Sequence, residues 1–192
     1  ESWHKDGIHL NKQNSFDDFI AAAEFLIQIK VTNPSRVAIN GASNGGLLMG
    51  AAMTQRPDLF QAVVAEMGLF DMIRYEQYAF ASLKIYENEY GTVEDSLQFQ
   101  NLLSYSPLHQ LKSDKDYPAT LVMTAFEDDR VLPVHSFKFV AGLRHFEDPL
   151  TPYLLYVQSE AGHYGASTLD DYVRASAIKY AFIMKHLGMD DK

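Results

Sequence analysis

The 192-residue sequence contains no cysteine and no run of 18 apolar residues. Without cysteine there is no disulfide framework, no thiolate metal site and no cysteine nucleophile. Without a long apolar run no transmembrane helix is expected, and we therefore expect no membrane partner. The lack of cysteine fits the cytoplasm, where we place the protein, although it would suit a periplasmic protein too.

Positive charge is also scarce, because 16 Lys and Arg residues stand against 25 Asp and Glu residues, for a formal net charge of −9. The basic residues form no cluster, and nucleic-acid binding needs a basic patch or stripe. We therefore expect no nucleic-acid partner. An acidic balance mainly favours solubility and does not by itself identify a partner.

The sequence lacks an initiator methionine and begins "ESWHK", which has no signal-peptide pattern. The chain starts within a pattern, so we expect it to be a fragment. Its length and its 47% hydrophobic content suffice for one substantial core. We therefore treat residues 1–192 as one partial domain.

Short apolar runs alternate with segments of helical periodicity along the chain. The runs predicted as strands are residues 36–40, 61–67, 119–125 and 152–158. The segments predicted as helices are residues 14–30, 47–53, 97–103, 134–144 and 168–187. Continuous apolar strands that alternate with helices are typical of an α/β fold with a mostly parallel sheet covered on both faces. In such a sheet, functional groups collect beyond the carboxyl ends of the strands.

The stretch "AINGASNGGLLMGAA" places Ser43 at a corner between a predicted strand and a predicted helix. Glycine and other small residues around the corner avoid collisions, and the turn lifts the serine hydroxyl above the sheet. This G-x-S-x-G pattern is typical of the nucleophile elbow of α/β-hydrolases. The alternative is an ordinary glycine-rich turn that binds phosphate at the helix N-terminus.

Two later loops contain the partners that a serine nucleophile requires. The segment "FEDDRV", with Asp128, follows the strand at 119–125, and "SEAGHYG", with His163, follows the strand at 152–158. A serine hydroxyl needs a base within hydrogen-bond reach, and the base needs an acid to orient it. The order Ser43, Asp128, His163 is that of the α/β-hydrolase triad.

Each triad residue also has a simpler interpretation, and a metal site is the competing chemical one. An aspartate after a strand is commonly a turn residue or a helix cap, and a histidine between glycine and tyrosine is commonly a loop residue. Carboxylates at positions 127–129 together with His163 offer hard ligands, but the adjacent Arg130 opposes a dense cation. We therefore expect no metal. Four other histidines lie in predicted helical or polar stretches and are expected to have no chemical role: His109, His135, His145 and His186.

Several segments together resemble the catalytic domain of the prolyl oligopeptidase family of serine peptidases. They are "ESWHKDG", "NKQNSFDDF", "NGASNGGLLMG", "QRPDLFQAVV", "YSPLH", "FEDDRVLPVHSFKF" and "AGHYG". The resemblance extends from Trp3 to the last predicted helix. It implies an α/β-hydrolase domain that hydrolyses short peptides on the carboxyl side of proline, with no metal or organic cofactor.

By this resemblance, Ser43 is similar to the family's nucleophile, Asp128 to its orienting acid and His163 to its general base. The backbone N–H of Asn44 is similar to one oxyanion donor. This agrees with its place directly after the nucleophile, at a helix N-terminus. Arg130 resembles the arginine that holds a substrate carbonyl, and its alternative is a salt bridge to a neighbouring carboxylate at position 127 or 129.

The substrate pocket departs from the family pattern. The family stacks the substrate proline on a tryptophan a few residues before a Tyr-Gly pair. Here that pair begins at Tyr90, and Tyr86 occupies the tryptophan position. Tyrosine can still stack on a pyrrolidine ring, over less area. Leu69 and Phe70 are expected to line the same pocket or to belong to the core. Tyr164 stands where the family commonly has a small residue, and we expect it to narrow the entrance.

The resemblance also implies parts that this chain does not contain, namely a β-propeller, the earlier strands of the sheet and an upstream tyrosine that donates to the oxyanion. We therefore expect a hydrolase fold truncated on its N-terminal side, with the missing part of the same protein as its partner. Two alternatives remain: an esterase or oligopeptidase of different specificity with the same triad, and a fragment without catalytic function.

Overall fold

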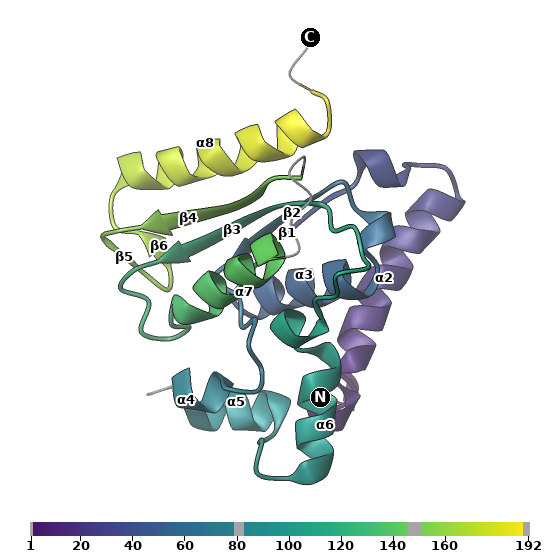
Figure 1. The fold of residues 1–192 in the computed structure, drawn as a ribbon, viewed down its shortest axis with the longest axis vertical. Coiled ribbons are helices and arrows are strands. Elements are labelled where there is room, and N and C mark those ends of the chain that lie inside the picture. Colours follow the sequence, from purple (N-terminus) through teal and green to yellow (C-terminus); the bar gives the residue numbers. More distant parts are fainter. Residues whose placement is uncertain (1, 79–82, 146–150, 190–192) are drawn as a thin grey trace.

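A computed structural model describes residues 2–78, 83–145 and 151–189 of the chain. Its centre is a parallel four-stranded sheet in the order β1-β2-β3-β4 (Figure 1). The strands are β1 (Ala38–Ala42), β2 (Ala62–Glu66), β3 (Ala119–Ala125) and β4 (Tyr153–Gln158). All four predicted strands are present and parallel. The first lies two residues later than predicted, so that it runs directly into the turn at Ser43.

The helices are α1 (Ser2–Lys5), α2 (Gln13–Gln28), α3 (Asn44–Gln55), α4 (Tyr75–Tyr78), α5 (Leu83–Tyr90), α6 (Ser96–Tyr105), α7 (Val134–His145) and α8 (Leu169–His186). All five predicted helices are among them. The tyrosine-rich segment between β2 and α6, for which the sequence predicted no helix because its periodicity is weak, contains α4 and α5. These helices are short, which explains the weak signal, since four to eight residues make only one or two turns.

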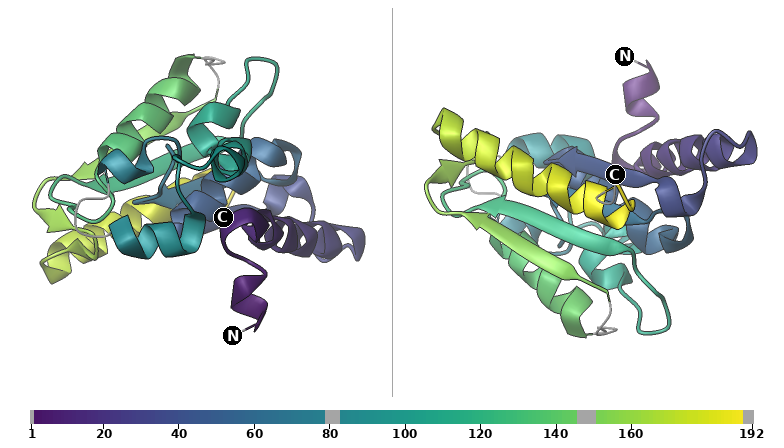
Figure 2. Two further views of the ribbon diagram at one scale, coloured as in Figure 1. Left: turned by 90° about the horizontal axis from the view of Figure 1, so that it is seen from below. Right: turned by 90° about the horizontal axis from the view of Figure 1, so that it is seen from above.

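Helices cover both faces of the sheet, as the apolar strands indicated (Figures 1 and 2). Helix α8 packs Phe182 against one face, next to Val64 of β2 and Leu121 of β3. Helices α3 and α7 cover the opposite face and form a core with Val63 and Val122. Neighbouring residues of β2 thus point into different cores, because side chains alternate across a strand.

Strand position in the sheet explains how deeply each strand is buried. Every residue of the inner strand β3 is buried, whereas in the outer strand β4 only Tyr153 is buried and the other five residues are partly buried or exposed. No helix among the described residues is long and apolar enough to cross a membrane. The order of parallel strands brings the loops after β1, β2, β3 and β4 to the same edge of the sheet.

A two-residue turn after β4 presents one candidate catalytic side chain. The short strands β5 (Ala161–Gly162) and β6 (Gly165–Ala166) pair antiparallel, so His163 and Tyr164 form the turn between them. Gly165 has φ +88°, a conformation that side chains rarely adopt, and this explains the glycine directly after the turn. The tight hairpin restricts the backbone position of His163.

Candidate active site

Ser43 occupies the corner between β1 and α3 with a strained backbone, φ 58° and ψ −120°. A non-glycine residue with positive φ is uncommon and is found where surrounding contacts impose it. Here the Ser43 N–H donates to the Glu66 carbonyl over 2.8 Å, and the Ser43 carbonyl accepts from Leu47 N over 3.1 Å. These bonds hold the corner to β2 and to α3, and Ser43 itself remains only half-buried.

Two glycines beside the corner are required because the backbone passes very close to them. A Cβ at Gly41 would lie 2.5 Å from the Gly45 carbonyl oxygen, and one at Gly46 would lie 2.7 Å from the Glu66 carbonyl oxygen. Gly45 differs, because a Cβ there would meet no atom within 4 Å. The steric explanation of the glycine pattern therefore holds at positions 41 and 46 but not for a side chain at 45.

The three predicted triad side chains meet beyond the carboxyl ends of their strands. His163 Nε2 lies 3.0 Å from Ser43 Oγ, and His163 Nδ1 lies 2.9 Å from Asp128 Oδ2. Asp128 is 1% exposed. Because a carboxylate can only accept, His163 donates from Nδ1, which leaves Nε2 as the acceptor for the Ser43 hydroxyl. This tautomer is the one that can remove the serine proton.

Backbone amides hold the Asp128 carboxylate in place. Its Oδ1 accepts from Arg130 N over 3.0 Å and from Val131 N over 2.8 Å. Asp128 thus stabilises its own loop as a turn residue and also contacts His163. The turn interpretation and the triad interpretation are therefore compatible. The part of the chain that the structure describes holds no group of three or more metal-ligating side chains placed to bind an ion.

Asn44 is the first residue of α3, and its backbone N–H belongs to the first turn, whose amides have no partner within the helix. Its side chain is held by Tyr90, whose hydroxyl donates to Asn44 Oδ1 over 2.9 Å. Burial raises the pKa of Tyr90 well above its usual value, so the phenol stays protonated and acts as the donor. The Asn44 N–H lies at the N-terminus of α3, directly after Ser43, which is a position where a backbone amide can stabilise negative charge.

A pocket of about 370 Å³ opens beside the serine. Its lining includes Ser43, Asn44, Leu69, Tyr86, Tyr90 and Arg130. Four of the five side chains predicted to bind substrate therefore lie at one site, namely Leu69, Tyr86, Tyr90 and Arg130. Phe70 is the exception: it is fully buried and stacks on Phe139 of α7 with ring centroids 4.5 Å apart. The prediction for Phe70 is corrected to a core residue, because consecutive residues after β2 face opposite ways.

The model of the prolyl oligopeptidase family matches residues 1–190 of this chain. The chain belongs to the prolyl oligopeptidase family. It is 40% identical over 190 residues to a prolyl endopeptidase of Elizabethkingia meningoseptica, a match that covers 98% of this chain and 27% of that protein. The chain thus spans about a quarter of the length of the curated relatives that it matches.

Solved structures of family members superpose closely on the chain. A structure from a study of two prolyl endopeptidases is 46% identical with a TM-score of 0.94, and the match covers 98% of this chain and 28% of that one. Oligopeptidase B from Leishmania major is 35% identical with a TM-score of 0.88, over 95% of this chain and 25% of that one. The α/β-hydrolase fold of the family is therefore confirmed for this chain.

Arg130 does not form the salt bridge that was its alternative. Its Nη1 donates to the Tyr164 hydroxyl over 3.0 Å, and its carbonyl accepts from the Tyr86 hydroxyl over 2.9 Å. Within residues 2–78, 83–145 and 151–189, no carboxylate lies within 4.0 Å of its guanidinium. Among these described residues no ion pair neutralises the charge of the guanidinium, which lies at the pocket.

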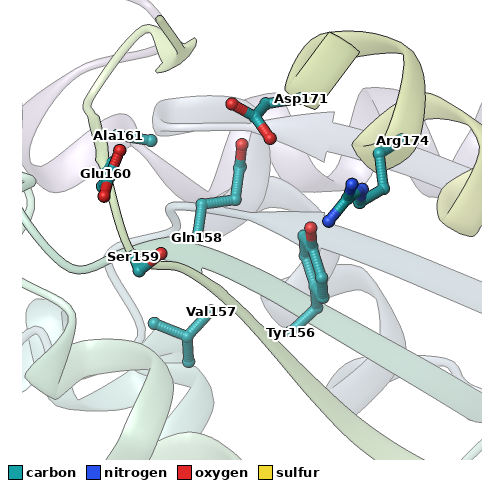
Figure 3. Close-up of a pocket in the computed structure, with 8 residues that line it drawn as sticks. All are labelled: Tyr156, Val157, Gln158, Ser159, Glu160, Ala161, Asp171 and Arg174. Atoms are coloured by element: carbon teal, nitrogen blue, oxygen red, sulfur yellow. The ribbon is translucent and has the colours of Figure 1, made fainter. Parts of the chain in front are cut away.

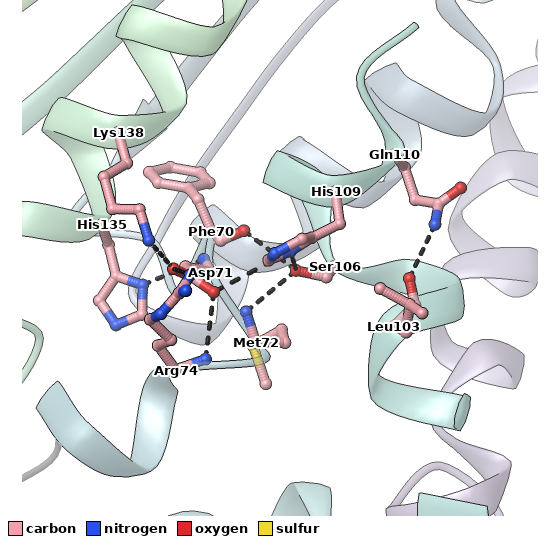
Figure 4. A network of polar contacts seen from close by, with 10 residues as sticks. All are labelled: Phe70, Asp71, Met72, Arg74, Leu103, Ser106, His109, Gln110, His135 and Lys138. Atoms are coloured by element: carbon pink, nitrogen blue, oxygen red, sulfur yellow. Dashed lines mark hydrogen bonds and ion pairs between the residues drawn. The ribbon is translucent and has the colours of Figure 1, made fainter. Parts of the chain in front are cut away.

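A buried polar network that sequence patterns missed supports the pocket wall (Figure 4). Asp71 is fully buried and contacts Lys138 through its carboxylate, and its N–H donates to His135 Nδ1 over 3.1 Å. Burial alone would raise the pKa of Asp71, but the Lys138 ammonium lowers it below its usual value. His109 lies 3.9 Å from the same carboxylate. The network ties the loop that carries Leu69 to α7.

Two of the histidines expected to have no chemical role, His109 and His135, thus have a structural one. A signal existed, because Asp71 follows β2 as Asp128 follows β3, at the carboxyl end of a strand. The sequence does not show which of several aspartates is buried with a histidine, since the partners lie 64 residues apart.

A second surface pocket lies between the end of β4 and the start of α8 (Figure 3). It measures about 380 Å³, and its lining includes Tyr156, Gln158, Asp171 and Arg174 but no triad residue. It adjoins the hairpin that carries His163 through Ala161.

Proposed function

We propose that this chain is the triad-bearing part of a serine endopeptidase that hydrolyses short peptides after proline. The observation that carries the proposal is the contact chain from Ser43 through His163 to Asp128. Support comes from relatives named prolyl endopeptidases. The absence of cysteine fits an enzyme acting in the cytoplasm.

In this proposal Ser43 Oγ attacks the carbonyl carbon of the scissile peptide bond while His163 Nε2 takes its proton. Asp128 stabilises the resulting imidazolium without becoming protonated. His163 then donates the proton to the leaving amine, and an acyl group remains on Ser43. A water molecule, deprotonated by His163, hydrolyses this ester and restores the serine.

The developing oxyanion is stabilised by the Asn44 backbone N–H in this proposal. One donor is half of a usual oxyanion hole, and loss of one donor costs on the order of 10²–10³ in turnover. We propose that the second donor belongs to the remainder of the protein, since the chain spans about a quarter of its relatives' length. The isolated chain should then react with small electrophiles but turn over peptides poorly.

The pocket beside Ser43 suits a proline ring better than a cationic side chain. Leu69, Tyr86 and Tyr90 provide apolar and aromatic surface against which a pyrrolidine ring can pack. The pocket also contains Glu89, which could attract an arginine. However, Lys12, only 3% exposed, contacts Glu89 Oε1 over 2.6 Å and neutralises that charge. We therefore favour proline over arginine in this pocket.

Labelling with a fluorophosphonate probe tests the proposed chemistry. We expect Ser43 to be labelled in the longer protein that carries this chain, and labelling to disappear in His163→Ala but to persist in the control His145→Ala, an exposed residue of α7. Absence of labelling in the unmodified protein would instead favour a fragment without catalytic function.

A panel of chromogenic substrates tests the specificity. Proline, arginine and alanine peptides and a short-chain ester are compared by kcat/KM. We expect the proline peptide to be preferred. Preference for arginine would favour an activity like that named for oligopeptidase B, to which the chain is also similar. Preference for the ester would favour an esterase.

A further inference from the structure

Tyr164 is held at both ends although its side chain is 90% exposed. Its ring meets the His163 ring edge-on, with centroids 5.7 Å apart and an angle of 79° between the planes. Its hydroxyl accepts from Arg130 Nη1 over 3.0 Å. An exposed tyrosine without a function would be free to sample several rotamers, whereas this one spans the gap between the triad histidine and a cationic side chain.

Hydrogen bonds fix the backbone of Arg130, whereas the position of its guanidinium depends on contacts with tyrosines. The Asp128 carboxylate accepts from its N–H, and the Tyr86 hydroxyl donates to its carbonyl. Hydrogen bonding to Tyr86, with a smaller effect of Tyr164, raises the pKa of Arg130 above its usual value. Its Nε is buried and finds no partner among the described residues. Because a guanidinium has five donors, its terminal nitrogens offer more than the one that Nη1 gives to Tyr164, and the Tyr164 bond restricts the direction in which the group points.

Two pockets have Arg130 and Ile85 in common among their lining residues. The first is the pocket beside Ser43 that was described above. The second is not the pocket between β4 and α8 but a third one, of about 550 Å³, whose lining includes Ile85, Asp129, His163 and Tyr164. Arg130 lines both. A peptide whose acyl group is bonded to Ser43 fills the first pocket with its last residue, and the preceding residue then passes Arg130 into the second.

We propose that Tyr164 is a specificity-determining residue: its hydroxyl holds the Arg130 guanidinium for a substrate carbonyl, and its ring limits the size of the residue preceding the cleaved proline. This inference rests on the proposed peptidase function. It separates two effects of one side chain. The hydroxyl affects how well any peptide binds, and the ring affects which peptides fit.

The test uses fluorogenic peptides X-Pro in which X is glycine, alanine, phenylalanine or tryptophan, with the longer protein that carries the chain. In Tyr164→Phe we expect KM to rise about fivefold for all peptides with kcat unchanged, the effect of one lost hydrogen bond. In Tyr164→Ala we expect the kcat/KM ratio of the tryptophan peptide to the glycine peptide to rise about tenfold, because a hydrophobic wall discriminates by that order.

Matched controls are Tyr172→Phe and Tyr172→Ala, which change an exposed tyrosine of α8 that lines neither pocket. They should leave both values unchanged. Fluorophosphonate labelling of Ser43 is measured in every variant. This small probe does not occupy the pocket that Tyr164 lines, so labelling reports on Ser43 independently of that pocket. Intact labelling with an unchanged size preference in Tyr164→Ala would overturn this inference alone. Loss of labelling and of proline-peptide hydrolysis in the unmodified protein would overturn the proposed function and this inference with it.

Discussion

The Tyr90 hydroxyl donates to Asn44 Oδ1 over 2.9 Å and so ties the end of α5 to the residue that follows Ser43. Tyr90 is 2% exposed, and the Lys12 ammonium lies 5.3 Å from its ring centroid. The contact joins segments 46 residues apart in the chain. It links the pocket wall to the first turn of α3, where the N–H that we propose as oxyanion donor is located.

We expect Tyr90→Phe to lower kcat for proline peptides about fivefold, the effect of one hydrogen bond. The ring remains, so the pocket keeps its shape and KM should change little. Steady-state kinetics on the longer protein measure both values. The control is Tyr180→Phe on the exposed side of α8. An increase in KM with unchanged kcat would show that the hydroxyl contacts substrate and does not position Asn44.

Asp128→Asn should reduce kcat by roughly 10³–10⁴, because an amide can hold the wrong His163 tautomer and cannot stabilise its cation. The amide keeps one oxygen for the backbone N–H donors, so the loop should remain folded. Asp114→Asn, an exposed aspartate that lines neither pocket, serves as control. Measurement combines kcat with the rate of fluorophosphonate labelling at Ser43. Full activity in Asp128→Asn would remove this residue from the proposed triad.

Gly41→Ala should destabilise the fold by about 2–4 kcal/mol, because its Cβ would lie 2.5 Å from the Gly45 carbonyl oxygen and must displace backbone. Gly45→Ala is the matched control, since its Cβ meets nothing within 4 Å and alanine favours helix by up to about 1 kcal/mol. Chemical denaturation gives both values. Equal stability of the two variants would contradict the close approach at the corner.

His135 predicts a loss of stability in mild acid. Burial lowers its pKa from 6.5 to about 4. As the pH falls from about 6.5 towards 4, the unfolded chain takes up a proton at this residue and the folded chain does not. The free energy of unfolding therefore falls as the pH falls through this window, by about 3 kcal/mol at most. Above the window the stabilising contribution of the neutral histidine is fully present.

The groups that face His135 act on it in opposite directions: the carboxylates of Asp71 and Asp128 raise its pKa, and Lys138 lowers it. Urea denaturation between pH 4 and 7 measures the dependence. His135→Asn, which keeps an acceptor for the Asp71 N–H, should flatten the profile in this window. His145→Asn, an exposed histidine of the same helix, should leave it unchanged. A wild-type slope in His135→Asn would exclude this histidine as the cause.

Local patterns in the sequence predicted the sheet, its helices and the meeting of the three candidate triad side chains, because each signal lies within a few adjacent residues. An apolar run identifies a strand, and a residue directly after it must lie at the carboxyl edge of a parallel sheet. That rule places Ser43, Asp128 and His163 at one edge without knowledge of any distant contact. The periodicity of the long helices was sufficient in the same way.

Only the tertiary structure decided which neighbouring side chain faces which way and which partner it finds. Leu69 and Phe70 are both buried apolar residues after the same strand, but they pack in different core clusters, and only Leu69 also lines the pocket beside Ser43. The Arg130 guanidinium contacts a tyrosine 34 residues away and forms no ion pair with Glu127 or Asp129 beside it. Burial and hydrogen-bond partners depend on segments that meet only when the chain folds. A residue's type therefore indicates what chemistry it can perform, and packing determines whether it reaches the atoms that need it.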